Sequence, residues 1–140
     1  MKMRLVLLLI AIFPALLLTE IHGQGHHRTA EKKKKITPKI LYGTASYYAD
    51  KFNGRKTAND EIFSQKKMTA ACNVLPMGTW IRVTNLKNKR SVIVRTNDRL
   101  HPRMKRIVDL SRMAAQKLGY IANGLTPVKV EVLGKKKPAV

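Results

Sequence analysis

One aspartate in this chain stands where acid–base chemistry would be expected. Residues 91–96 are rich in valine, isoleucine and threonine, a pattern typical of a buried strand, and they continue directly into Asn97, Asp98 and Arg99. A carboxyl group at the rim of a packed sheet is held rigidly and still reaches a cleft, as a catalytic acid or base must. The alternative is that Asp98 only stabilises the turn that follows, as Asp and Asn often do. The residues themselves leave both interpretations open.

Short strands are expected to position this aspartate. Residues 80–86 alternate apolar with polar side chains and predict a half-buried strand. A turn around Asn88 would join it to the 91–96 strand as a hairpin. Residues 42–48 and 128–132 predict two further strands, the first with small residues at alternate positions and the second with alternating valines.

The sequence also predicts one clear helix. Asp109 and Ser111 offer capping side chains before residues 112–118, and Gly119 is a natural stop. The remaining ordered residues are expected to be mostly strand, and about six short strands within residues 41–133 must hide their edges. We therefore predict a mainly β fold, a small closed or nearly closed barrel with one or two short helices.

The first residues predict export. Two basic residues precede an almost unbroken apolar stretch at 5–18, which is shorter than the roughly 20 residues that a membrane-spanning helix needs. We predict a signal peptide over residues 1–23, cleaved near Gly23, with an uncleaved anchor as the alternative. No Cys follows the apolar stretch, so no lipid anchor is expected. The mature protein would be periplasmic or associated with the cell wall, and would meet the membrane only during export.

The chain is strongly basic, with a formal net charge of +20. We expect residues 24–40 to be a disordered basic tether and residues 134–140 a basic tail, because both have too few apolar residues to form a core. Such a charge attracts polyanions in general. Nucleic acid would be the first candidate for a cytoplasmic protein, but export and an aromatic content of only 6% argue against it. An exported protein instead meets cell-wall polymers and anionic lipid surfaces, and the charge by itself favours neither.

The sequence offers no pattern for a metal, a cofactor or a disulfide. The paired His26 and His27 have no Cys or further His at ligand spacing, so we expect neither a metal nor another cofactor. Cys72 is the only cysteine and cannot form an intramolecular disulfide. It is most simply a small buried apolar residue, with a reactive thiol or an intermolecular bridge as the alternative. We expect a monomer that is stabilised by its core alone.

Three long motifs carry a family resemblance. GTASYYADKFNGRKTANDEIFSQKKMTAA, LPMGTWIRVTNLKNKRSVIVRTNDR and RIVDLSRMAAQKLGY resemble the rare lipoprotein A (RlpA) family, and the similarity runs from about Gly43 to Leu133. The resemblance implies a six-stranded double-psi β-barrel, the fold of expansins and of one class of membrane-bound lytic transglycosylase. It also implies an enzyme, an endolytic lytic transglycosylase that cleaves the MurNAc–GlcNAc β-1,4 bonds of peptidoglycan glycan strands. The products would carry 1,6-anhydro-MurNAc ends, and strands stripped of stem peptides would be preferred.

The same resemblance implies a set of site residues. The catalytic carboxylates would be Asp98, as the acid and base, and Glu61, which would steady the positive charge of the transition state or position the sugar. Residues expected to bind substrate are Tyr47, Thr57, Cys72, Asn97 and Arg99. Tyr47, with Tyr48 and Trp80, is a candidate for stacking on sugar, although a place in the core is at least as compatible with these aromatic residues.

The chain also departs from the family pattern. Cys72 stands where a His is common, and a thiol cannot carry a proton as an imidazole does. Asp60 replaces a common Gly, and Leu100-His101 replaces the usual Gly-Pro. These changes keep a second hypothesis open, in which the domain is a non-catalytic, expansin-like module that binds cell-wall glycan.

Overall fold

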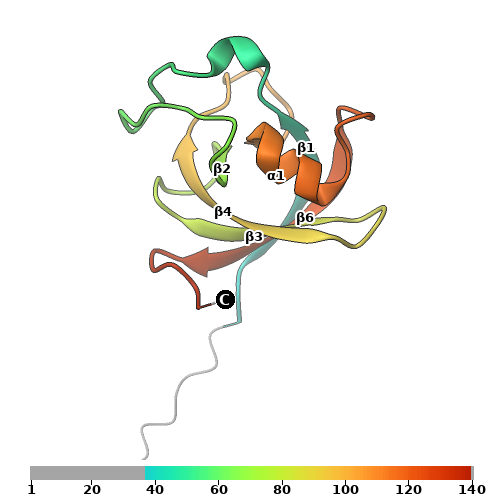
Figure 1. Cartoon of the computed structure of the whole chain (residues 1–140). Helices are drawn as coiled ribbons and strands as arrows, with labels where there is room; N and C mark the ends of the chain where they lie inside the picture. The colour runs from blue at the N-terminus through green and yellow to red at the C-terminus, as the bar shows by residue number, and fades with distance from the viewer. Residues whose placement is uncertain (1–36, 140) are drawn as a thin grey trace, which may run out of the picture. The chain divides into compact units, whose positions relative to one another are not determined.

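The computed structural model describes residues 37–139, and the predicted signal peptide and nearly all of the predicted tether lie outside this range. Within it, six strands close into a barrel (Figure 1). The strands are β1 (Ile40–Tyr47), β2 (Thr69–Ala71), β3 (Trp80–Asn85), β4 (Ser91–Asp98), β5 (Val108–Leu110) and β6 (Thr126–Gly134). A 3-10 turn, η1 (Asp50–Phe52), follows β1, and one α-helix, α1 (Arg112–Leu118), follows β5.

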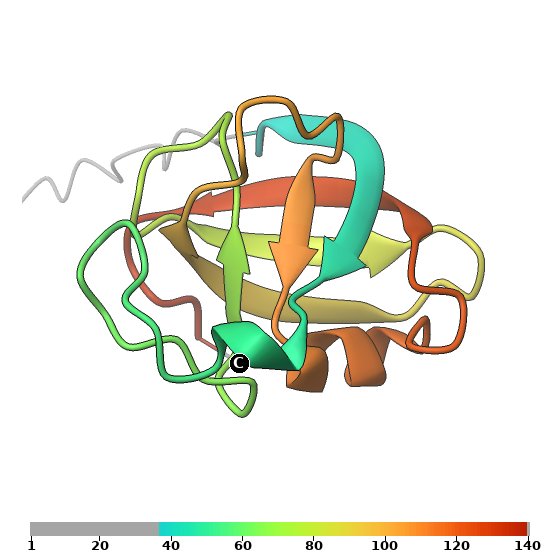
Figure 2. The same ribbon diagram turned by 90° about the horizontal axis from the view of Figure 1, so that it is seen from above.

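The order of the strands around the barrel is β1-β5-β2-β4-β3-β6. β1 and β5 are parallel, as are β2 and β4, whereas the other neighbours are antiparallel. Figure 2 shows the short strands β2 and β5 side by side and running in opposite directions. The prediction of a mainly β, closed six-stranded barrel is confirmed, and the topology is consistent with a double-psi barrel.

The core lies inside the barrel and is built by alternation along the strands. Ile81 pairs with Val94 on one side and with Val132 on the other, and Val83 pairs in the same way with its neighbours on β4 and β6. Ile81, Val83 and Val94 are completely buried, while Arg82 between them is exposed. Burying each such side chain contributes roughly 1.5–3 kcal/mol relative to leaving it exposed. Because β3 and β4 are consecutive in the chain and pair in antiparallel fashion, the predicted hairpin is confirmed.

Helix α1 packs its small residues against this core. The Ser111 hydroxyl accepts a hydrogen bond from the backbone N–H of Ala114, and Gly119 ends the helix in the left-handed conformation at φ +75°. The predicted bounds are confirmed. The capping prediction for Asp109 is wrong, because this residue lies in β5 and its carboxylate binds Arg106. None of the helices within residues 37–139 is long and apolar enough to cross a membrane.

The basic residues after β6 contact the barrel. Lys135 donates a hydrogen bond from Nζ to the backbone carbonyl of Met77, and Lys137 Nζ lies 6.0 Å from the centroid of the Trp80 ring. The second contact places the Lys137 ammonium group over the Trp80 ring.

Candidate active site

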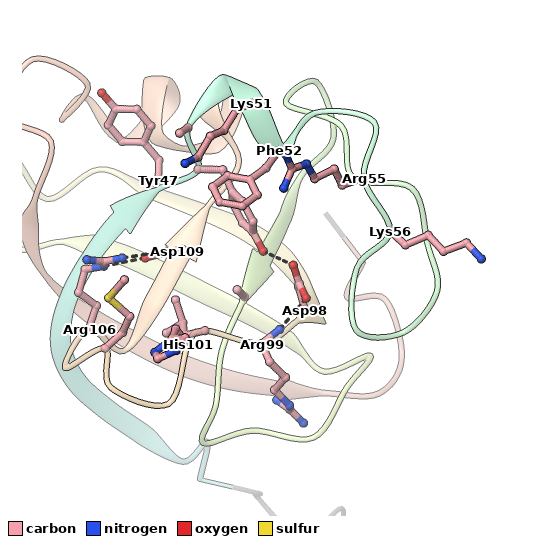
Figure 3. A pocket seen from close by; sticks show the side chains of 15 residues that line it. Tyr47, Lys51, Phe52, Arg55, Lys56, Asp98, Arg99, His101, Arg106 and Asp109 are labelled. Carbon is pink, nitrogen blue, oxygen red and sulfur yellow. Dashed lines mark hydrogen bonds and ion pairs between the residues drawn. The ribbon is translucent and has the colours of Figure 1, made fainter.

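A cavity of about 740 Å³ lies among the end of β1, the turn η1 and the end of β4 (Figure 3). This volume is within the range of about 300–1,000 Å³ that small-ligand sites occupy. Its walls come from seven residues within 47–56, from six residues within 98–106, and from Ala71 and Asp109. The strand end that the sequence singled out therefore opens onto a cavity.

A bulge near the end of β4 brings Asp98 to this cavity. β2 pairs Ala70 with Thr96 but Ala71 with Asp98, so Asn97 is an extra residue in β4. Thr96 and Asn97 are consecutive buried residues, and Asp98 follows them on the cavity wall. A bulge of this kind re-aims the side chain next to it.

Three donors hold the Asp98 carboxylate. The backbone N–H groups of Ala58 and Arg99 donate to Oδ1, each over 2.8 Å, and the Tyr48 hydroxyl donates to Oδ2 over 2.6 Å. Tyr48 stacks on Phe63, with ring centroids 4.1 Å apart. Burial first, and the hydrogen bond and charge of Asp98 next, raise the pKa of Tyr48 well above its ordinary value of 10.0. Tyr48 therefore stays protonated, and its proton faces Asp98.

Glu61 does not line the cavity. One of its oxygens pairs with Arg95 and accepts a hydrogen bond from Asn59 over 3.0 Å, while the other accepts from Asn97 Nδ2 over 3.0 Å. Hydrogen bonds from Asn97 first and Arg95 second hold the Glu61 pKa below its ordinary value. The geometry makes Glu61 the anchor of its loop.

That loop supplies one of the Asp98 contacts. Thr57 is buried, its hydroxyl donates to Asn59 Oδ1 over 2.6 Å, and its N–H donates to the Glu61 carbonyl over 2.8 Å. These bonds fix the neighbouring Ala58, whose N–H reaches Asp98. Asp60 has φ +65°, a conformation that favours glycine and that explains the glycine common at this position in the family pattern. Thr57 and Glu61 thus organise the loop, and neither lines the cavity.

Cys72 and Arg99 occupy different surroundings. The Cys72 side chain is completely buried, as the simpler interpretation predicted, and has no surface with which to touch a sugar. Its N–H donates to the Asp98 carbonyl over 3.0 Å. Arg99 lines the cavity, but its guanidinium donates to the backbone carbonyls of Cys72 and Leu75. Arg99 therefore braces the chain that follows β2.

The three aromatic residues considered for stacking on sugar differ in whether they line the cavity. Tyr47 lines the cavity, yet its hydroxyl donates to the Ile121 carbonyl over 2.9 Å and its ring meets Tyr120 edge-on. Trp80 lies outside the cavity wall. Tyr48 and Phe52 line it, with their ring centroids 5.9 Å apart.

A second carboxylate in the cavity was not predicted as a site residue. Asp109 accepts hydrogen bonds from Arg106 over 2.9 and 3.1 Å and from the Ser46 hydroxyl. The motif RIVDLSRMAAQKLGY contains both Arg106 and Asp109, and this was the available signal. Within residues 37–139, no group of three or more His, Cys, Asp or Glu side chains is placed to hold a metal ion.

Comparison with known proteins gives consistent results. Residues 41–130 match the family model described as lytic transglycolase. A Neisseria meningitidis protein named endolytic peptidoglycan transglycosylase RlpA is 40% identical over 127 residues, covering 85% of this chain and 53% of the relative. A Pseudomonas aeruginosa protein of the same name is 52% identical over 91 residues, covering 65% of this chain and 27% of the relative. The chain thus spans about half the length of the Neisseria relative, and less of the other.

Solved structures agree on the fold. An expansin from Clavibacter michiganensis superposes with a TM-score of 0.54 at 22% identity, covering 73% of this chain and 53% of the expansin. The Streptomyces papain inhibitor superposes with a TM-score of 0.55 at 19% identity, covering 67% of this chain and 94% of the inhibitor. At these identities the likeness concerns the barrel alone.

Proposed function

This chain belongs to the lytic transglycolase family, and from that premise we propose that it is an endolytic transglycosylase acting on peptidoglycan glycan strands. The bond cleaved would be the β-1,4 bond between MurNAc and GlcNAc, and the product would carry a 1,6-anhydro-MurNAc end. The names of the relatives support the reaction and the substrate, and the cavity at Asp98 supports a site for them.

The observation that carries the proposal is the placement of Asp98. Its carboxyl group lies on the cavity wall, and three hydrogen bonds fix it there. In its protonated form the group donates its proton to the glycosidic oxygen as the bond to the anomeric carbon breaks. The resulting carboxylate then takes the proton of the MurNAc C6 hydroxyl as that oxygen attacks the anomeric carbon. One carboxyl group serves both steps and no water is consumed.

The neighbouring groups assist by position. The Tyr48 hydroxyl and the N–H of Ala58 orient the two Asp98 oxygens. Asp109, the other cavity carboxylate, is paired with Arg106, so Asp98 is the cavity carboxylate that has no ion-pair partner among residues 37–139. Ordinary hydrolysis usually requires two carboxylates, whereas the intramolecular attack needs only one. We assign Glu61 to positioning the loop.

The second candidate is a non-catalytic module that binds cell-wall glycan. Cys72 favours it, because the side chain at this position is buried and offers no imidazole. Incubation with peptide-free glycan strands followed by mass spectrometry separates the two. Products with 1,6-anhydro-MurNAc ends support the enzyme, and intact strands that sediment with the protein support the binding module.

We further propose that the protein acts outside the cytoplasm as a monomer and prefers strands without stem peptides. The signal-peptide pattern at residues 1–23 and the basic segment after it support export. The intact mass of the protein recovered from a secreting host tests this, because export with cleavage near Gly23 removes the first residues.

A further inference from the structure

Positive charge dominates the cavity wall. Its formally charged side chains are Lys51, Arg55, Lys56, Arg99 and Arg106, against Asp98 and Asp109. Arg106 pairs with Asp109, and Arg99 is committed to backbone carbonyls. Lys51 and Arg55 have no carboxylate partner among residues 37–139, so their charges are available to a ligand.

These two cations flank an exposed aromatic ring. Lys51 Nζ and Arg55 Cζ each lie 5.4 Å from the centroid of the Phe52 ring, and Phe52 is 36% exposed (Figure 3). An aromatic face offers a flat apolar surface to the C–H groups of a sugar ring. Cations beside that face would meet an anionic substituent of the same sugar, and Arg in particular matches a carboxylate with two parallel hydrogen bonds.

The ring and the cations are held close to the proposed catalytic carboxylate. Phe52 meets Tyr48 edge-on, and Tyr48 donates to Asp98. Gln65 Nε2 donates to the Tyr48 carbonyl over 2.8 Å, and Arg55 N–H donates to the Phe52 carbonyl over 3.1 Å. A ligand at Phe52 would therefore occupy a sugar position next to the bond at Asp98.

We infer that Lys51, Phe52 and Arg55 form a specificity subsite that selects glycans carrying free carboxylates over neutral glycans with the same backbone. If the proposed function holds, the carboxylate is the lactyl group of MurNAc. That group is charged when the stem peptide is absent and becomes a neutral amide when the peptide is attached. The subsite would then recognise the stripped glycan through the charge of the lactyl group beside the sugar ring, because the carboxylates of an attached stem peptide lie farther from that ring.

The test is a binding measurement with two matched sugars. One is a peptide-free GlcNAc–MurNAc oligosaccharide, and the other is the same molecule with its lactyl carboxyl groups reduced to alcohols. Calorimetric titrations at low salt use the full chain with Asp98→Asn, so that no sugar is consumed. We expect the carboxylate form to bind about tenfold more tightly, because two exposed charge contacts are involved.

Two charge-matched variants decide the assignment. Lys51→Gln/Arg55→Gln should remove most of the tenfold preference and leave binding of the reduced sugar unchanged. Lys87→Gln/Arg90→Gln removes the same charges from the turn between β3 and β4, outside the cavity wall, and should keep the preference. Phe52→Leu should weaken the binding of both sugars by the same factor.

Three results would overturn the inference. They are equal affinity for the two sugars before any change at Lys51 or Arg55, a preference that survives Lys51→Gln/Arg55→Gln, and an equal loss in the control pair. Turnover is scored separately with the unsubstituted chain. Anhydro products without charge discrimination would support the proposed function and contradict the subsite. Charge discrimination without anhydro products would support the subsite and contradict the proposed transglycosylase activity.

Discussion

Replacing Glu61 by glutamine tests whether this residue holds the loop that contacts Asp98. Glu61 accepts hydrogen bonds from Arg95 on one oxygen and from Asn97 on the other. Glutamine has only one acceptor oxygen, so its amide NH₂ must face one of these donors. Asn97 is 2% exposed and its Oδ1 has no partner within residues 37–139, so the bond to Glu61 is the one side-chain hydrogen bond of this amide there.

The expected loss of stability follows from these contacts. An unpaired buried amide costs about 1–3 kcal/mol. The ion pair with Arg95 adds about 0.5–1 kcal/mol, a figure kept low because both side chains are about one-third exposed. We expect Glu61→Gln to lose about 2 kcal/mol at neutral pH. For a domain of this size the melting temperature would fall by about 10 °C.

The pH dependence gives an independent check of the Glu61 prediction. Because folding lowers the Glu61 pKa, its carboxylate stabilises the protein fully above its ordinary value of 4.5, and this contribution is lost as the pH falls further. The gap between the two proteins, measured by urea unfolding, should therefore narrow below pH 4.5. Equal stability at pH 7, or a gap that does not change on acidification, would refute the positioning role.

Three further measurements, two of them on substituted proteins, test the surrounding structure. Gly43→Ala should destabilise by about 1–3 kcal/mol in thermal melts, since the new Cβ would lie 2.8 Å from Ile107 Cβ, and an unchanged melt would contradict that packing. Cys72 should resist thiol reagents until urea unfolds the protein, because it is completely buried, and rapid labelling of the folded chain would place it at the surface. Tyr48→Phe should lower kcat about tenfold with KM little changed, because one hydrogen bond to Asp98 disappears; a full-speed variant would show that the hydroxyl plays no part in orienting Asp98.

The long strands and the helix were predictable because each carries a local pattern. Ile81 and Val83 alternate with polar residues, and Ser111 and Gly119 mark the ends of α1. The strands β2 and β5 have three residues each, which is too short for any periodicity, and neither was predicted. They form only because the barrel supplies partners on both sides.

The candidate site was predictable in part for the same reason. Asp98 ends a strong strand pattern, but the bulge at Asn97 that turns it to the cavity depends on pairing with β2. Contacts between residues far apart in the chain decide that Asp109 lines the cavity and Glu61 does not. Phe52 with its two cations lies in a turn whose exposure no local pattern indicates.

The most direct test of the proposed mechanism is the rate at which Asp98→Asn releases 1,6-anhydro-MurNAc ends from peptide-free glycan strands. Asparagine keeps the size of the side chain, its oxygen can still accept from the N–H groups of Ala58 and Arg99, and its NH₂ can donate to the Tyr48 oxygen, but it cannot exchange a proton. We expect the rate to fall by at least the general acid–base contribution of about 10²–10⁴-fold, with the melting temperature little changed. Release of anhydro ends at the rate of the unsubstituted protein would contradict the assignment of Asp98 as acid and base.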